Sequence, residues 1–109
     1  MNRVAAAAAI VVAMAATIPG MAVAKPAPRT VTVVIDKLTF GPMPSGLRVG
    51  DTILWQNRDI FRHSATAPGH FNLDLAAGTN GRMTLGKAGV FPFTCKYHPG
   101  MKGVLKVSP

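Results

Sequence analysis

Short runs of alternating apolar and polar residues, separated by turn signals, make up most of the chain after residue 24. The first run, residues 30–36, alternates with a period of two and is rich in β-branched side chains, as half-buried strands are. Further runs follow at intervals of about eight to twelve residues, and no window after residue 24 has a long helical period. This pattern predicts an all-β domain, an antiparallel sandwich or barrel of short strands.

The runs that we expect to form the remaining strands are 47–49, 52–56, 64–66, 70–75, 82–85, 90–95 and 103–107. Proline lacks a backbone N–H, so Pro92 must face outward or lie at an edge of its sheet.

The first 24 residues have a different composition. Arg3 is followed by an uncharged stretch from Val4 to Ile18 and by the small residues Ala22 and Ala24. A positive start, an apolar run and an Ala-x-Ala end are typical of a secretory signal peptide, here with cleavage after Ala24. The alternative is an uncleaved membrane anchor, which Pro19-Gly20 disfavours. We therefore predict a signal peptide at 1–24, a flexible leader at 25–29 and one domain at 30–109.

The charge balance is strongly basic, with 12 Lys and Arg against four Asp and a formal net charge of +8. Removal of Arg3 with the signal peptide would leave a net charge of +7. The basic residues are scattered rather than gathered on a helix, and aromatic residues are few, so the pattern does not favour nucleic acid. It favours an acidic protein partner or, at most peripherally, an anionic membrane surface, and it is also compatible with solubility alone.

Only one cysteine, Cys95, is present, so no internal disulfide can form in an exported chain. It begins the motif Cys95-x-x-His98-x-x-Met101, in which Pro99-Gly100 makes a tight turn. A thiolate, an imidazole and a thioether are donors that a blue copper site brings together, lacking one more imidazole. That imidazole must come from His63 or His70. We favour His63, because a ligand beside a sheet end is held more rigidly than one on a loop.

These residues resemble the cupredoxins, the small blue copper proteins, and among them the short-loop amicyanin-like group. The resemblance extends over nearly the whole mature chain, through Phe40-Gly41-Pro42, Val49-Gly50-Asp51-Thr52-Ile53 before Trp55, Asn57-x-Asp59 ahead of a histidine, and Gly89-Val90-Phe91-x-Phe93-x-Cys95. It implies a Greek-key β-sandwich of about seven or eight strands that holds one type 1 copper ion.

The resemblance also implies the ligands, which are His63, Cys95, His98 and Met101. His63 stands where the resembling family carries its first histidine ligand. Many cupredoxins have an asparagine directly after that histidine, which ties the two ligand loops together. This chain has Ser64 there, and we expect its shorter side chain to reach less far.

The expected function is that of a periplasmic or otherwise exported monomer that shuttles single electrons between redox partners. In the resembling family the imidazole edge at the position of His98 is the electron port. No paired carboxylates or Ser/His/Asp order indicate an enzyme. Positive charge from Arg62, Lys96 and Lys102 would favour partners with acidic docking surfaces. The alternative is a copper carrier or buffer, although a carrier usually offers several methionines or histidines on an open surface.

Overall fold

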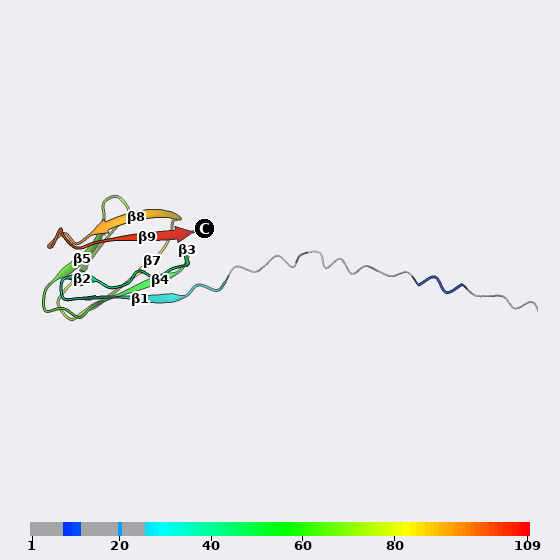
Figure 1. The fold of residues 1–109 in the computed structure, drawn as a ribbon, viewed down its shortest axis with the longest axis horizontal. Helices are drawn as coiled ribbons and strands as arrows, with labels where there is room; N and C mark the ends of the chain where they lie inside the picture. Colours follow the sequence, from blue (N-terminus) through cyan, green and yellow to red (C-terminus); the bar gives the residue numbers. More distant parts are fainter. Residues whose placement is uncertain (1–7, 12–19, 21–25) are drawn as a thin grey trace, which may run out of the picture.

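Two β-sheets face each other in the computed structural model, which describes residues 8–11, 20 and 26–109. Figure 1 shows the sheets as two layers whose strands run along the long axis of the domain. The predicted signal peptide and its cleavage after Ala24 lie, apart from residues 8–11 and 20, outside the described residues. Within that part of the chain no helix is long and apolar enough to cross a membrane.

The four-stranded sheet has the order β2-β1-β4-β7. Its strands are β1 (Thr30–Asp36), β2 (Thr39–Phe40), β4 (Thr52–Asn57) and β7 (Asn80–Thr84).

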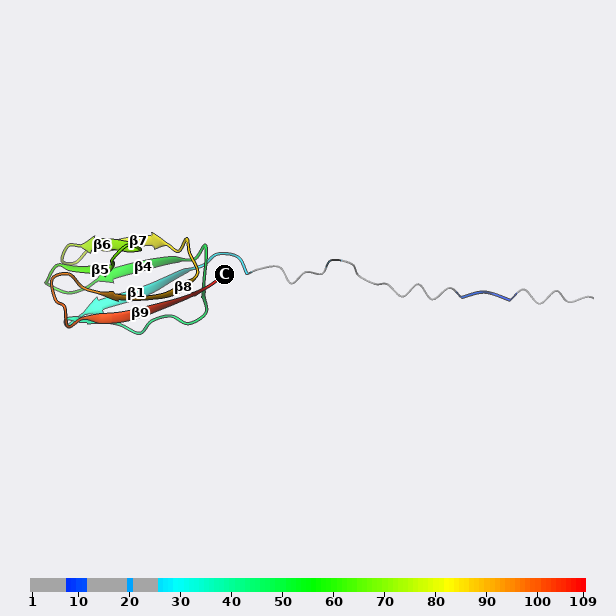
Figure 2. The same cartoon turned by 90° about the horizontal axis from the view of Figure 1, so that it is seen from above.

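The five-stranded sheet has the order β3-β9-β8-β5-β6. Its strands are β3 (Leu47–Arg48), β5 (His63–Ala67), β6 (Phe71–Leu75), β8 (Gly89–Thr94) and β9 (Lys102–Ser108). In Figure 2, β6 and β7 lie side by side at one edge, where the two sheets approach each other.

The prediction of an all-β sandwich is confirmed. The described residues form nine strands rather than seven or eight, because Thr39–Phe40, where no strand was expected, form the two-residue strand β2. The expected antiparallel pairing does not hold in two places, since β1 pairs with β4 and β3 pairs with β9 in parallel. A parallel pair needs a crossover connection, and local alternation in a sequence does not reveal crossovers. The parallel pairing of these strands therefore could not be predicted from local alternation.

The core lies between the sheets and is centred on an aromatic group. Trp55 of β4 is fully buried, and its ring meets those of Phe40 and Phe93 edge to face, with centroids 5.9 and 5.4 Å apart. Edge-to-face pairs of this kind add to the hydrophobic gain of burying large rings. Phe93 precedes Cys95 by two residues, so the same packing that holds the sheets together also holds the end of β8.

Candidate metal centre

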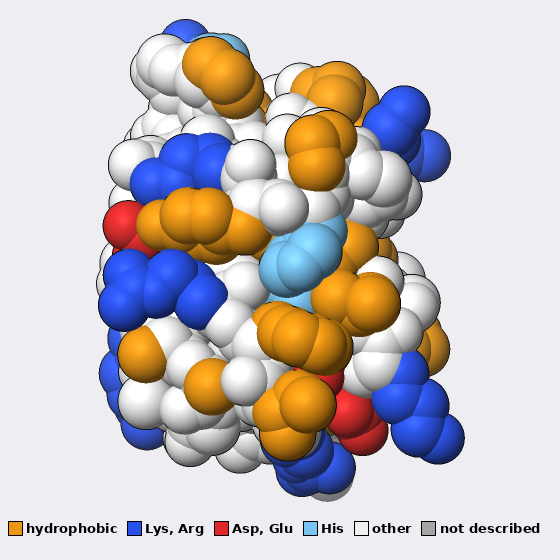
Figure 3. Space-filling model, turned by 90° about the vertical axis from the view of Figure 1, so that its left-hand side faces the viewer, with side chains coloured by type: hydrophobic (Ala, Val, Ile, Leu, Met, Phe, Trp, Pro, Cys, Tyr) orange, Lys and Arg blue, Asp and Glu red, His pale blue; other side chains and the backbone are white. Residues whose placement is uncertain are grey.

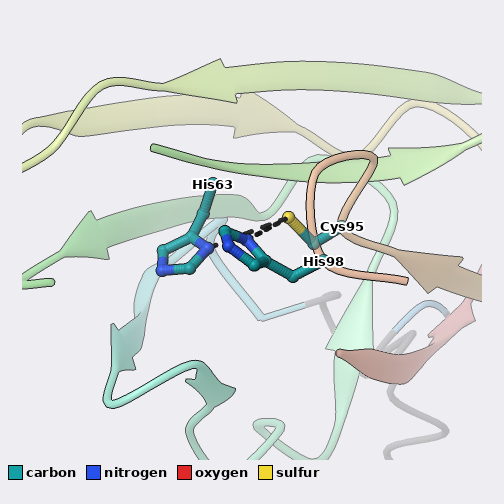
Figure 4. A group of neighbouring side chains, drawn as sticks. All are labelled: His63, Cys95 and His98. Carbon is teal, nitrogen blue, oxygen red and sulfur yellow. Dashed lines mark hydrogen bonds between the residues drawn. The ribbon is translucent and has the colours of Figure 1, made fainter. Parts of the chain in front are cut away.

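Two segments that are far apart in the sequence meet at one end of the sandwich. His63 is the first residue of β5, whereas Cys95 follows directly after β8, and the two strands pair antiparallel through Thr66 and Thr94. The start of one strand and the end of the other are therefore neighbours. His98 returns to the same place from the loop after Cys95 (Figure 4).

The three side chains direct their donor atoms toward one another. The Nδ1 atoms of His63 and His98 each lie 3.8 Å from the Sγ atom of Cys95. Metal bonds of roughly 2.0 Å to nitrogen and 2.3 Å to sulfur, at an angle of about 120°, would separate these atoms by about 3.7 Å. Among the described residues this is the group of His, Cys, Asp or Glu side chains arranged to hold a metal ion.

Met101 belongs to the same end of the molecule and is 5% exposed. The loop that carries it is closed by its own backbone, because the N–H of Cys95 donates to the C=O of Met101 at 3.1 Å. The N–H of Met101 in turn donates to the C=O of His98 at 2.8 Å. All four residues that the sequence indicated are thus brought together, and they form a plausible single copper site.

The environment of Cys95 favours a thiolate. Burial of the thiol is the largest single effect and raises its pKa, but several hydrogen bonds together outweigh it, the foremost being the N–H of Ser64, which donates to Sγ at 3.3 Å. The rings of His63 and His98 and the N–H of Tyr97 lower the pKa further, to about 6. A thiolate is the form of cysteine that binds metals, so the lowered pKa of Cys95 favours the metal-binding form even without a metal.

A buried polar network supports His63, which is fully buried. The Oδ2 atom of Asp59 lies 2.9 Å from Nε2 of His63, on the side of the ring away from Cys95. Asn57, at the end of β4, accepts the N–H of Asp59 at 3.0 Å and donates to the C=O of Leu75 at 3.1 Å. The sequence pattern Asn57-x-Asp59 had marked these positions, but their support of His63 follows only from the structure.

Ser64 ties the two ligand segments together, contrary to the expectation that its short side chain would reach less far. Its Oγ atom accepts the backbone N–H of Lys96 at 2.8 Å and lies 2.9 Å from Oγ1 of Thr66. Because the hydroxyl of Thr66 donates to Asn72, the hydroxyl of Ser64 is left to donate to Thr66. A serine suffices here because the backbone of Lys96 approaches closely.

His70 lies at the other end of β5, in the turn after Ala67, and takes no part in the cluster. Its ring packs against Phe91, with centroids 4.9 Å apart, and it lines a surface cavity of about 440 Å³. The length of β5, whose five residues from His63 to Ala67 span roughly 13 Å, separates the two histidines. The preference for His63 over His70 therefore agrees with the placement of both side chains.

The surface around the site is apolar at its centre and basic at its rim. Figure 3 shows this end of the molecule, with a histidine in the middle, hydrophobic side chains around it, and Lys and Arg further out. Phe61, which is 45% exposed, packs near the ring of His98 at a centroid distance of 5.9 Å. Neighbouring Ile60 is 82% exposed, so the two adjacent side chains together add contiguous apolar area to the surface.

One of the expected rim charges is neutralised. The Nζ atom of Lys96 lies 3.1 Å from Asp74, which also accepts the hydroxyl of Tyr97 at 2.9 Å. The side-chain hydrogen bond with Lys96, followed by that with Tyr97, lowers the pKa of Asp74, so the carboxylate is charged at neutral pH. Lys96 is therefore less free to attract a partner than the sequence suggested.

No protein-family model and no curated protein sequence matches the chain. Among solved structures, it is similar to a reduced Cu(I) form of an amicyanin variant at pH 4, with 26% identity and a TM-score of 0.63 over 72% of this chain and 82% of that one. It is also similar to amicyanin from Paracoccus versutus, with 24% identity and a TM-score of 0.63 over 79% and 87% of the two chains.

The chain has the β-sandwich fold of the cupredoxins, and its donor cluster is a possible type 1 copper site. Within that class the structural neighbours of the chain are amicyanins, as the short ligand loop had indicated.

Proposed function

We propose that this protein is an exported type 1 blue copper protein that carries single electrons between larger redox proteins. The observation that supports the proposal is the convergence of the Cys95 thiol with the Nδ1 atoms of His63 and His98. Two imidazoles, a thiolate and a weakly held thioether are the donor set of a blue copper site. Copper bound there would supply a one-electron couple, Cu(II)/Cu(I).

Each residue has a distinct role in this proposal. Cys95, His63 and His98 would be the three strong ligands, and Met101 the long axial one. His63 is held by buried side chains and Met101 by the closed backbone of its loop. When the ligands are held in place, the site needs little rearrangement as copper changes between its two oxidation states. A site of this kind suits an electron carrier better than a catalyst.

His98 would be the electron port, because it is only half-buried whereas the other donors are buried. The exposed side chains of Ile60, Phe61 and Tyr97 provide apolar area around it. Such a patch suits a brief encounter with another protein, in which the ring edge of His98 comes close to the partner. The net positive charge would attract redox partners with acidic docking surfaces and raise the rate of encounter. We expect a monomer in the periplasm or another exported location.

The decisive experiment is an absorption spectrum of the copper-loaded chain. We expect an intense visible band from thiolate-to-copper charge transfer, which Cys95→Ser abolishes because no other thiol is present. Met101→Leu is the matched control, and it should leave a coloured site with a changed reduction potential. A blue Cys95→Ser protein would overturn the proposal. A coloured wild-type chain that surrenders its copper to a weak chelator upon mixing would instead indicate a copper carrier.

A further inference from the structure

The carboxylate of Asp59 is the one acidic side chain in the described residues that reaches a proposed copper ligand. Its Oδ2 atom lies 2.9 Å from Nε2 of His63 and also accepts the N–H of Leu38 at 2.9 Å. Its Oδ1 atom accepts the N–H of Ile60 at 2.8 Å. The side chain is 8% exposed, so water competes little for these bonds.

The placement of the two ring nitrogens of His63 determines where its proton must be. Nδ1 faces Cys95 and must be free of a proton when it binds a metal. Nε2 faces a carboxylate, which only accepts hydrogen bonds, so Nε2 carries the proton and donates it to Asp59. His98 has no corresponding side-chain partner among the described residues, so the two proposed histidine ligands differ in their support.

We propose that Asp59 is a positioning residue that fixes the ring and tautomer of His63 and strengthens its bond to copper. The inference rests on the proposed copper site. A carboxylate that accepts the outer N–H of a metal-bound histidine raises the basicity of the inner nitrogen. A more basic nitrogen stabilises Cu(II) more than Cu(I), because the more highly charged ion gains more from electron donation. Asp59 therefore lowers the reduction potential and raises the affinity for copper.

A purely structural role is the competing explanation, because Asp59 also holds the turn between β1 and β2. Lys37 and Leu38 in this turn have left-handed φ angles of 50° and 59°, which non-glycine residues adopt at some cost. Asp36 holds the same turn from the other side, since its Oδ1 atom accepts the N–H of Lys37 at 2.9 Å. Asp36 is exposed, and none of its hydrogen bonds reaches His63. It is thus a matched control for both the charge and the turn.

The test compares Asp59→Asn with Asp36→Asn in the full-length, copper-loaded protein. For Asp59→Asn we expect a reduction potential above that of the wild type and an affinity for Cu(II), measured by chelator competition, that is about 10- to 100-fold lower. Asp36→Asn should change neither quantity. Unchanged values in Asp59→Asn, or equal shifts in both variants, would overturn the proposal. If Asp59→Asn does not fold, Asp59→Glu replaces it. This variant should raise the reduction potential, because the longer side chain displaces the carboxylate from Nε2 of His63. An unchanged potential would contradict the proposal.

A second measurement separates this inference from the proposed function. In the copper-free protein, the Nε2 proton of His63 should appear far downfield in the NMR spectrum and exchange slowly with solvent, and Asp59→Asn should reverse both properties. Asp36→Asn should leave the proton where it is. A wild-type chain that takes up no copper would overturn the proposed function, while the ring proton would still decide whether Asp59 fixes His63. An Nε2 proton that is indifferent to Asp59→Asn would overturn the inference even in a blue protein.

Discussion

The two segments that supply the proposed ligands are supported in opposite ways. The upstream segment, residues 57–64, is held by buried polar side chains, and its ligand His63 is fully buried. The downstream loop, residues 95–101, is held by its own backbone hydrogen bonds, and its ligand His98 is half-buried beside Phe61. One side of the site thus provides rigidity while the other provides access, and an electron carrier needs both.

Deletion of each imidazole would test this comparison most severely. We expect both His63→Gly and His98→Gly to lose the blue absorption, because each removes one of three strong donors. Added imidazole should restore the colour in His98→Gly, since that ring leaves a gap open to solvent. It should not do so in His63→Gly, where the gap is closed. His70→Gly is the control and should remain blue. Equal rescue of both variants would mean that the two segments are equally accessible.

The next largest effect concerns the thiol that joins the two segments, in the copper-free protein. The pKa of Cys95 is lowered to about 6 in the folded chain, whereas that of an unfolded cysteine is about 8.5. Between these values the unfolded chain binds one more proton, so stability rises with pH. The gain is complete above the unfolded pKa, amounts to about 3 kcal/mol at most, and is lost as the pH falls through about 6.

Chemical unfolding of the copper-free chain at a series of pH values would measure this gain. Cys95→Ala is the control, because it lacks the thiol and should show a flatter profile over the same interval. A wild-type profile as flat as that of Cys95→Ala would mean that the donors from the two segments do not hold a thiolate.

Much of the fold and of the proposed site could be predicted from the sequence because the signals are local. Alternation located most strands within one or two residues, and the spacing of Cys95, His98 and Met101 indicated a single loop of donors. The position of His63 followed from its place ahead of a short strand.

Contacts between distant residues could not be predicted in this way. Asp59 and His63 are four residues apart, yet the bond between them depends on how the loop between β4 and β5 folds over the core. The ion pair between Lys96 and Asp74 joins the ligand loop to β6, and no local pattern connects them. The parallel pairing of β1 with β4 likewise arises from the crossover between sheets.

A smaller effect would follow if the link between the two segments were cut. Ser64→Ala removes the acceptor for the N–H of Lys96, which then lies part-buried without a partner. We expect a loss of about 1–2 kcal/mol in the free energy of unfolding. Thr66→Val is the matched control, because it alters the next hydroxyl along the chain but spares the bond between Ser64 and Lys96. If Thr66→Val costs as much as Ser64→Ala, the link itself adds nothing.

The smallest effect concerns the surface charge beside the accessible segment. Lys102 follows Met101 directly at the start of β9, and Lys106 lies four residues further along the same strand, roughly 13 Å away. If electrons leave through His98, a charge near that end should steer an anionic oxidant such as ferricyanide, whereas a charge further away should matter less. Lys102→Glu should therefore slow oxidation of the reduced protein several-fold at low ionic strength, and added salt should reduce the difference. Lys106→Glu carries the same change in net charge and should have a smaller effect in stopped-flow measurements. Equal slowing by both substitutions would show that only the overall charge matters. The surface near His98 would then not be a preferred place for electron exit.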